Sequence, residues 1–231
     1  MSLASWLSPG RWCYQCHRWI APEVHLPAPS LCPACHEALP WFRREICFFC
    51  GHVHLSGECR EDFEAEITDY QAIFTYQEPI SHWVSGLKYS RNLLAGRILR
   101  ALTEAWLLEH KDWVLGYDLM APVPIHSARL RVRGFNQTSF LVARQTLVPL
   151  ELNLLHKVKY TKHQAALRGK SRYTNLTKSF AADPAVEGKK ILLFDDVCTT
   201  GQTLNQLAYT LKRAGAEEVG ALSLGRTKGQ M

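Results

Sequence analysis

The stretch "ILLFDDVCTTGQTL", residues 191 to 204, decides the fold predicted for this chain. Its first four residues, Ile191 to Phe194, are apolar without alternation, which is typical of a parallel-sheet strand covered by helices on both faces. We therefore expect Asp195 and Asp196 to lie at the carboxyl end of that strand. From Thr203 onward, apolar residues recur at helical spacing and predict a helix.

The loop between this strand and this helix carries the chemistry. It reads Cys198-Thr199-Thr200-Gly201-Gln202 and is predicted to cross the mouth of the sheet at a helix N-terminus, where free N–H groups and the helix dipole favour an anion. The Thr hydroxyls add donors, and Gly201 lets the backbone come close. A phosphate site beside two carboxylates indicates a ligand such as ribose 5-phosphate, whose 2′- and 3′-hydroxyls the carboxylates would bind. The loop lacks the Gly-Lys-Ser/Thr of ATP-type phosphate loops.

Strands and helices are expected to alternate around this stretch, as in an open parallel α/β sheet. Strands are predicted with Ala72, Phe74 and Tyr76 on one face, and at 117–123, 150–155, 191–194 and 219–224. Helices are predicted around Trp83, Val84 and Leu87, around a face of Leu93, Leu94, Ile98, Leu99, Leu102 and Trp106, around 140–147, and from Thr203. Such sheets bind ligands beyond the carboxyl ends of their strands. A domain junction is placed near residue 62.

Seven of the eight cysteines precede residue 60. Cys13-x-x-Cys16 and Cys32-x-x-Cys35 have the spacing of a zinc ribbon, in which two turns direct four thiolates at one Zn²⁺. A second group, Cys47, Cys50 and Cys59, supplies three thiolates for a further metal site. The fourth ligand is left open between His52, His54 and Asp62, and a metal-free, reduced state of this second group is the alternative.

Charge and hydropathy limit the classes of function. The chain is 47% hydrophobic, without an apolar run of 18 residues or a signal peptide, so we expect a cytoplasmic protein with no membrane span. Residues 126 to 190 carry thirteen basic and three acidic side chains, a net charge of +10. Such a block suits phosphate, pyrophosphate or nucleic acid, although a solvated basic face is the ordinary alternative.

Residues 191 to 204 resemble the signature for phosphoribosyl pyrophosphate in type I phosphoribosyltransferases. Nearly the whole chain is similar to the ComF/GntX family of phosphoribosyltransferase-like proteins, which is associated with competence and with the use of external DNA. The further residues that carry this resemblance are the N-terminal cysteines, Pro122-Val-Pro124, Arg133-Gly-Phe-Asn-Gln137, and the spaced set Gln164, Leu167, Arg172, Asn175 and Phe180.

The resemblance implies a type I phosphoribosyltransferase-like open parallel sheet over residues 63–231 and a small Cys-rich, zinc-ribbon-like module over residues 1–62. It implies that Mg²⁺ accompanies the sugar pyrophosphate and that Asp195 and Asp196 orient the sugar. The sugar-phosphate site would contain Thr199, Thr200, Gly201, Gln202 and Thr203. The pyrophosphate side would contain Arg133, Gly134, Asn136, Gln137, Gln164 and Arg172, with Lys162 and Arg168 as further basic candidates. The family commonly closes its second metal site with another Cys-x-x-Cys, whereas this chain reads Cys59-Arg-Glu-Asp62.

Three functions are compared on this basis. The favoured one is an accessory protein in DNA uptake or utilisation that retains a phosphoribosyl site, with catalysis left open. The second is a transferase that salvages a free nucleobase, and the third is a zinc-containing adaptor for single-stranded DNA or for DNA-uptake proteins. Related transferases often pair, so a homodimer is one expected assembly.

Overall fold

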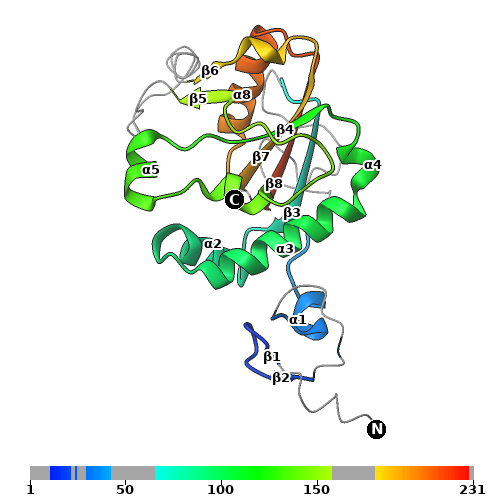
Figure 1. Cartoon of the computed structure of the whole chain (residues 1–231). Coiled ribbons are helices and arrows are strands. Elements are labelled where there is room, and N and C mark those ends of the chain that lie inside the picture. Colours follow the sequence, from blue (N-terminus) through cyan, green and yellow to red (C-terminus); the bar gives the residue numbers. More distant parts are fainter. Residues whose placement is uncertain (1–10, 22–23, 25–29, 43–65, 158–179, 229–231) are drawn as a thin grey trace.

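The computed structural model describes residues 11–21, 24, 30–42, 66–157 and 180–228 of the 231-residue chain. Its elements up to the second sheet strand are β1 (Arg11–Trp12), β2 (Trp19–Ile20), α1 (Pro33–Glu37), β3 (Asp69–Thr75), α2 (Ile80–Tyr89), α3 (Leu93–Glu109), α4 (Lys111–Val114) and β4 (Leu119–Pro122). They are followed by α5 (Ser127–Arg133), α6 (Gln137–Val142), β5 (Leu155–Lys157), β6 (Phe180–Ala182), η2 (Pro184–Val186), β7 (Lys190–Cys198), α8 (Gln202–Arg213) and β8 (Glu218–Arg226). The order alternates strands with helices in the larger part of the chain (Figure 1).

The central sheet has four strands in the order β3-β8-β7-β4, and all three pairings are parallel. In this register Ile191 pairs with Val219 and Phe194 pairs with Leu222. A parallel neighbour needs a crossover connection, and helices supply those crossovers here. The open parallel α/β sheet predicted from the sequence is confirmed.

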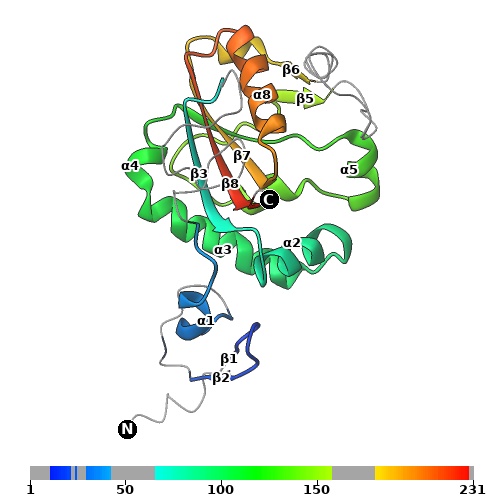
Figure 2. The same ribbon diagram turned by 180° about the vertical axis from the view of Figure 1, so that it is seen from behind.

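Helices cover both faces of this sheet, and β7 shows why its sequence is apolar without a break. Leu192 and Phe194 pack into one core with α2, α3 and α6. Ile191 and Leu193 pack into the other core with α8 and the antiparallel β5–β6 pair. Figures 1 and 2 show α2 and α3 on one side of the strands and α8 on another. Successive side chains of a strand point to opposite faces, so each of these four residues is buried.

Several predicted boundaries were wrong. The strand predicted at 191–194 begins at Lys190 and continues through both aspartates to Cys198. Its neighbour β8 pairs with it as far as Arg226. The strand expected at 150–155 begins only at Leu155, and Leu150 makes an isolated bridge to Met120. Tyr76 lies just beyond the end of β3.

The predicted apolar face of α3 was also partly wrong. Ile98, Leu99 and Leu102 are buried as expected, but Leu93 and Leu94 are about half exposed. These two residues form the first turn of α3, which follows the N-cap Asn92. The remainder of the helix packs under the sheet, so the first turn projects past the core.

The described part of the N-terminal segment packs directly on the sheet domain. Residues 40–42 lie along the edge of β3, where Phe42 N–H donates to Ile73 at 3.0 Å and Thr75 N–H donates to Pro40 at 2.7 Å. Asn92 Nδ2 donates to the Tyr14 hydroxyl at 2.8 Å. This segment therefore covers the open edge of β3 and shares a core with the body. The junction predicted near residue 62 lies outside the described residues.

Candidate functional site

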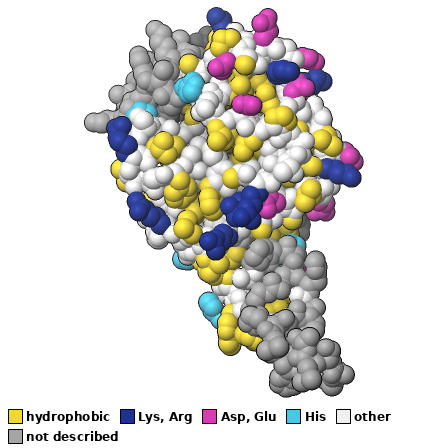
Figure 3. All heavy atoms as spheres, in the orientation of Figure 1, with side chains coloured by type: hydrophobic (Ala, Val, Ile, Leu, Met, Phe, Trp, Pro, Cys, Tyr) yellow, Lys and Arg dark blue, Asp and Glu magenta, His cyan; other side chains and the backbone are white. Residues whose placement is uncertain are grey.

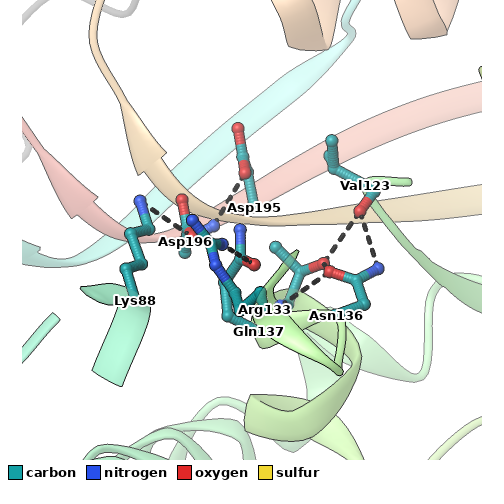
Figure 4. A network of polar contacts seen from close by, with 8 residues as sticks. Lys88, Val123, Arg133, Asn136, Gln137, Asp195 and Asp196 are labelled. Atoms are coloured by element: carbon teal, nitrogen blue, oxygen red, sulfur yellow. Dashed lines mark hydrogen bonds and ion pairs between the residues drawn. The ribbon is translucent and has the colours of Figure 1, made fainter. Parts of the chain in front are cut away.

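The two acids of β7 occupy different surroundings because the strand runs through them. Asp195 and Asp196 are consecutive strand residues, so their side chains leave the backbone on opposite faces. Figure 4 shows the two carboxylates on either side of the ribbon. Both acids lie near the carboxyl end of β7, one on each face, and the strand continues past them to Cys198.

Asp196 is paired with a lysine that the sequence did not single out. Its side chain is 7% exposed, and its Oδ2 lies 2.9 Å from Nζ of Lys88 on α2, which is 17% exposed (Figure 4). Among the described residues, this oxygen has no hydrogen-bond partner apart from that ammonium group. A buried carboxylate needs such a partner to stay charged. No sequence signal marks Lys88, because it stands 108 positions before Asp196 on a helix that reads as an ordinary core helix.

Asp195 has a raised pKa. Burial raises its pKa to about 7, and the charge of Asp196 raises it as well. The backbone N–H of Asp196, which donates to Asp195 Oδ1 at 2.8 Å, acts in the opposite direction, as does the charge of Lys88. The carboxyl group therefore titrates near neutral pH, as polar groups at binding sites often do.

The loop after β7 has the geometry of an anion site. Thr199 and Thr200 are exposed, and Gly201 has a left-handed backbone with φ of 68° at the N-cap of α8. The exposed Gln202 and Thr203 form the first turn of that helix. The first N–H groups of a helix have no partner within it, so this turn presents donors and the positive end of the helix dipole.

The neighbouring Cys198 is a buried thiol. Burial raises its pKa to about 11, against the opposing effect of the Arg226 charge and of a hydrogen bond from Tyr70. A thiol that stays protonated at neutral pH is a poor nucleophile. We therefore interpret Cys198 as a small space-filling residue at the end of β7 and not as a nucleophile.

Four residues predicted for the pyrophosphate side lie where α5 ends and α6 begins, after β4: Arg133, Gly134, Asn136 and Gln137. Gly134 ends α5 with φ of 86°, and Asn136 caps α6. Asn136 Nδ2 and the Thr138 hydroxyl both donate to the carbonyl of Val123, at 3.1 and 2.8 Å. The connection is thereby fixed to the carboxyl end of β4, which neighbours β7 in the sheet.

Arg133 and Gln137 lie on this connection with their side chains joined by a hydrogen bond from Nη1 to Oε1. The Arg133 guanidinium also lies 5.8 Å from the ring centre of Tyr89, which follows Lys88 in the chain. Figure 4 shows Arg133 and Gln137 in one network view with the Lys88–Asp196 pair.

Basic side chains continue around this side of the molecule. Arg129 and Arg131 of α5 and Arg91 before α3 are exposed, and Arg91 Nη2 donates to the Val132 carbonyl at 3.3 Å. Figure 3 shows Lys and Arg side chains spread over one face, with acidic side chains over its upper part and right edge. Four further predicted residues, Gln164, Arg172, Lys162 and Arg168, lie outside the described residues.

The first four cysteines form a cluster that fits a tetrahedral metal ion. The Sγ atoms of Cys13, Cys16, Cys32 and Cys35 all lie within 4.8 Å of one another, and those of Cys16 and Cys32 are 3.8 Å apart. Four bonds of 2.3 Å from zinc to sulfur place the sulfur atoms about 3.8 Å apart. The cluster is therefore compatible with zinc, as the Cys-x-x-Cys spacing predicted. Cys47, Cys50 and Cys59, with the candidates His52, His54 and Asp62, lie outside the described residues.

The electrostatic interactions among the four thiols also favour a bound cation. Burial raises the pKa of Cys13, but N–H donors including that of Cys32, 3.5 Å from Sγ, lower it to about 6. Burial and the neighbouring sulfur atoms instead raise the pKa of Cys35 far above its ordinary value. Four thiolates this close repel one another, so a bound cation is what allows all four to ionise.

Comparisons with known proteins give the chain's family. A family model described as "Phosphoribosyl transferase domain" matches residues 138–228. "Competence protein F" of Haemophilus influenzae is 27% identical over 88% of this chain and 93% of its own length. "DNA utilization protein YhgH" of Escherichia coli K12 is 30% identical over 86% of this chain and 91% of its own length.

Among solved structures, the allosteric regulatory enzyme of purine biosynthesis is 26% identical over 46% of this chain. That match spans 22% of the enzyme's own chain, with a TM-score of 0.33, and supports no argument about function.

Sheet, loop and family model together define a phosphoribosyltransferase domain preceded by a four-cysteine cluster. Because its similarity to the YhgH protein covers most of both chains, the chain belongs to the ComF/YhgH family of phosphoribosyltransferase-domain proteins. None of the helices in the part of the chain that the structure describes is long and apolar enough to cross a membrane.

Proposed function

We propose that this protein binds phosphoribosyl pyrophosphate, or a related ribose phosphate, at the carboxyl end of its parallel sheet and acts in the uptake or utilisation of external DNA. One structural observation supports the proposed binding of a ribose phosphate. The end of β7 sets two acids beside an exposed Thr/Gly loop, and a left-handed glycine joins that loop to the first turn of a twelve-residue helix.

In this proposal, different residues bind different parts of the ligand. The N–H groups and hydroxyls of Thr199 to Thr203 hold the 5-phosphate, and Asp195 and Asp196 accept hydrogen bonds from the ribose hydroxyls. Arg133 and Gln137 face the pyrophosphate, which Mg²⁺ would accompany. Lys88 adds a cation that pairs with Asp196 and orients its side chain. Zn²⁺ held by the first four cysteines would stabilise the N-terminal segment.

The role in DNA use rests on the relatives. Their names refer to competence and to DNA utilization, and the similarity covers most of each chain. Expression of this chain in Escherichia coli that lacks its YhgH protein is expected to restore the use of external DNA. The same strain should gain nothing from a double variant that cannot bind the sugar.

Calorimetry with phosphoribosyl pyrophosphate and Mg²⁺ tests the binding site. The double variant Asp195→Asn, Asp196→Asn should bind at least about a hundredfold more weakly, because two charge-assisted hydrogen bonds of about 1.5 kcal/mol or more each are lost. Asp118→Asn is the matched control, since Asp118 accepts a backbone hydrogen bond from Lys190 at the opposite end of the sheet. Undiminished affinity in the double variant would rule out this site. Release of pyrophosphate on adding a free nucleobase would instead assign a salvage transferase.

A further inference from the structure

Arg226 is a fully buried arginine directly behind the phosphate loop. It is the last residue of β8 and pairs in register with Cys198, the last residue of β7. Its exposed fraction is 0%, which is rare for an arginine. Neither its position nor its neighbours in the sequence single it out.

The side chain holds the start of the loop by its carbonyl groups. Nη1 of Arg226 donates to the carbonyl of Cys198 at 3.2 Å and to the carbonyl of Thr199. The next residue assists, because Thr227 N–H donates to the Cys198 carbonyl at 3.0 Å and its hydroxyl lies 3.4 Å from the Thr199 carbonyl. Nη1 also donates to the Thr227 carbonyl at 3.1 Å, which joins the two residues into one support.

This support fixes the direction of the loop's amide groups. In a planar trans peptide the C=O and the following N–H point in opposite directions. When the carbonyls of Cys198 and Thr199 are held toward the interior, the N–H groups of Thr199 and Thr200 are turned away from it, toward the exposed side of the loop. Donors fixed in advance bind an anion more tightly, since no ordering is needed on binding.

Arginine suits this position for two reasons. Its guanidinium group stays protonated when buried, whereas a lysine there would tend to lose its proton. Its positive charge also reaches the loop, where it lowers the pKa of the Cys198 thiol against the larger effect of burial. The same charge favours an anion above the loop.

We propose that Arg226 is a positioning residue of the phosphate site, which acts by holding the carbonyls of Cys198 and Thr199 and makes no contact with the ligand. This inference rests on the proposed function and assigns the rigidity of its phosphate loop to a residue outside the loop.

Two variants test this role. Arg226→Lys replaces the planar guanidinium with an amine that tends to lose its proton when buried, and Arg226→Gln keeps N–H donors without charge. Both are expected to weaken the binding of ribose 5-phosphate at least tenfold and to speed hydrogen exchange at the amides of Thr199 to Gln202 at least tenfold. Exchange in the strands of the sheet should stay within twofold, which a general loss of stability would not allow. Arg100→Lys on α3, which rests on the ring of Phe140, is the matched control.

Thr227→Val tests the support of the loop if neither Arg226 variant folds. This partly buried residue loses only its hydroxyl contacts, with the Thr199 carbonyl and with Nη1 of Arg226, so the variant should fold and speed exchange at the same amides by about threefold. Unchanged loop exchange and affinity in the folded variants, with ribose 5-phosphate bound by the wild type, would overturn the inference alone. A wild type that binds neither ribose 5-phosphate nor phosphoribosyl pyrophosphate would overturn the proposed function, while faster loop exchange in the variants would still support the hold of Arg226 on the loop.

Discussion

At the scale of single residues, the partners of Asp195 and Asp196 control how the site responds to pH. Asp196 is paired with Lys88, whereas Asp195 is held by a backbone N–H and carries a pKa of about 7. The ordinary value is 3.8. The folded protein therefore holds this proton more tightly than the unfolded chain between pH of about 4 and about 7. Its contribution to stability falls as the pH rises through that window.

Asp195→Asn is expected to raise the melting temperature at pH 8 and to leave it nearly unchanged at pH 4, because the variant removes a buried charge that exists only at the higher pH. Thermal unfolding at both pH values, without ligand, measures this. Lys88→Gln is expected to lower the stability at pH 8, by about 3 kcal/mol, since it leaves Asp196 buried without its cation. An Asn variant that is less stable than the wild type at pH 8 would contradict the assigned pKa.

The sequence predicted the identity of these acids but not their partners. Twin carboxylates after an apolar strand are a local pattern that a single stretch contains. Lys88 and Arg226 reach the same end of the sheet from α2 and β8, and nothing near them in the chain indicates this destination. Buried cations of this kind are found only when the contacts of the fold are known.

At the scale of elements, the junction of β7 with α8 depends on one backbone conformation. Gly201 has φ of 68°, a region in which an L-residue with a Cβ costs about 1 kcal/mol or more. The residue also ends the loop and begins the helix, so strain here would shift the donors of the anion site.

Gly201→Ala is expected to lose about 1 kcal/mol of stability and to bind phosphoribosyl pyrophosphate at least tenfold more weakly. Gly188→Ala is the matched control. Gly188 has φ of 66°, a Cβ there would meet no atom within 4 Å, and the residue precedes β7 at the far end of the sheet. Urea unfolding should show a similar loss for both variants, whereas calorimetry should show weaker binding for Gly201→Ala only. Equal affinities of the two variants for phosphoribosyl pyrophosphate would show that Gly201 does not support the binding site.

Helices could be predicted where apolar residues recur with a clear helical period. Strand boundaries that depend on pairing with a neighbouring strand could not. The face of α8 with Leu204, Leu207 and Leu211 is buried as its spacing predicted. The end of β7 was misplaced because charged residues usually mark the end of an apolar strand, whereas here β8 pairs with it to Cys198. Hydrogen bonds from a neighbouring strand set the boundary, and the sequence of β7 alone does not contain them.

At the scale of the whole molecule, the N-terminal cysteine cluster is part of the structural support of the sheet domain. Its residues pack in one core with the body, and the segment that follows covers the edge of β3. Loss of a metal ion from the cluster would expose that edge and the apolar side chains beneath it. Unpaired strand edges favour aggregation.

Cys16→Ser is therefore expected to lose one equivalent of zinc, to unfold at a lower temperature and to aggregate more readily, while the folded fraction still binds the sugar pyrophosphate. Mass spectrometry of metals in protein purified without added zinc gives the stoichiometry, and light scattering gives aggregation. Ser85→Ala, at an exposed position of α2, is a control of similar size. Less than one equivalent of zinc in the wild type would remove the metal from this account, and a second equivalent would indicate a site at Cys47, Cys50 and Cys59.

The sequence by itself determined the parallel α/β class, through its alternation of predicted strands and helices. It also contained the acids of β7, the Thr/Gly loop and the four-cysteine cluster, since each is a short local pattern with its own spacing. Only the tertiary structure placed the two acids on opposite faces, paired Asp196 with Lys88, set Arg226 behind the loop and laid residues 40–42 along β3. These contacts join residues that are between about 30 and about 110 positions apart. Burial against a distant partner leaves no period or motif in the chain, so the fold must be known before such contacts can be seen.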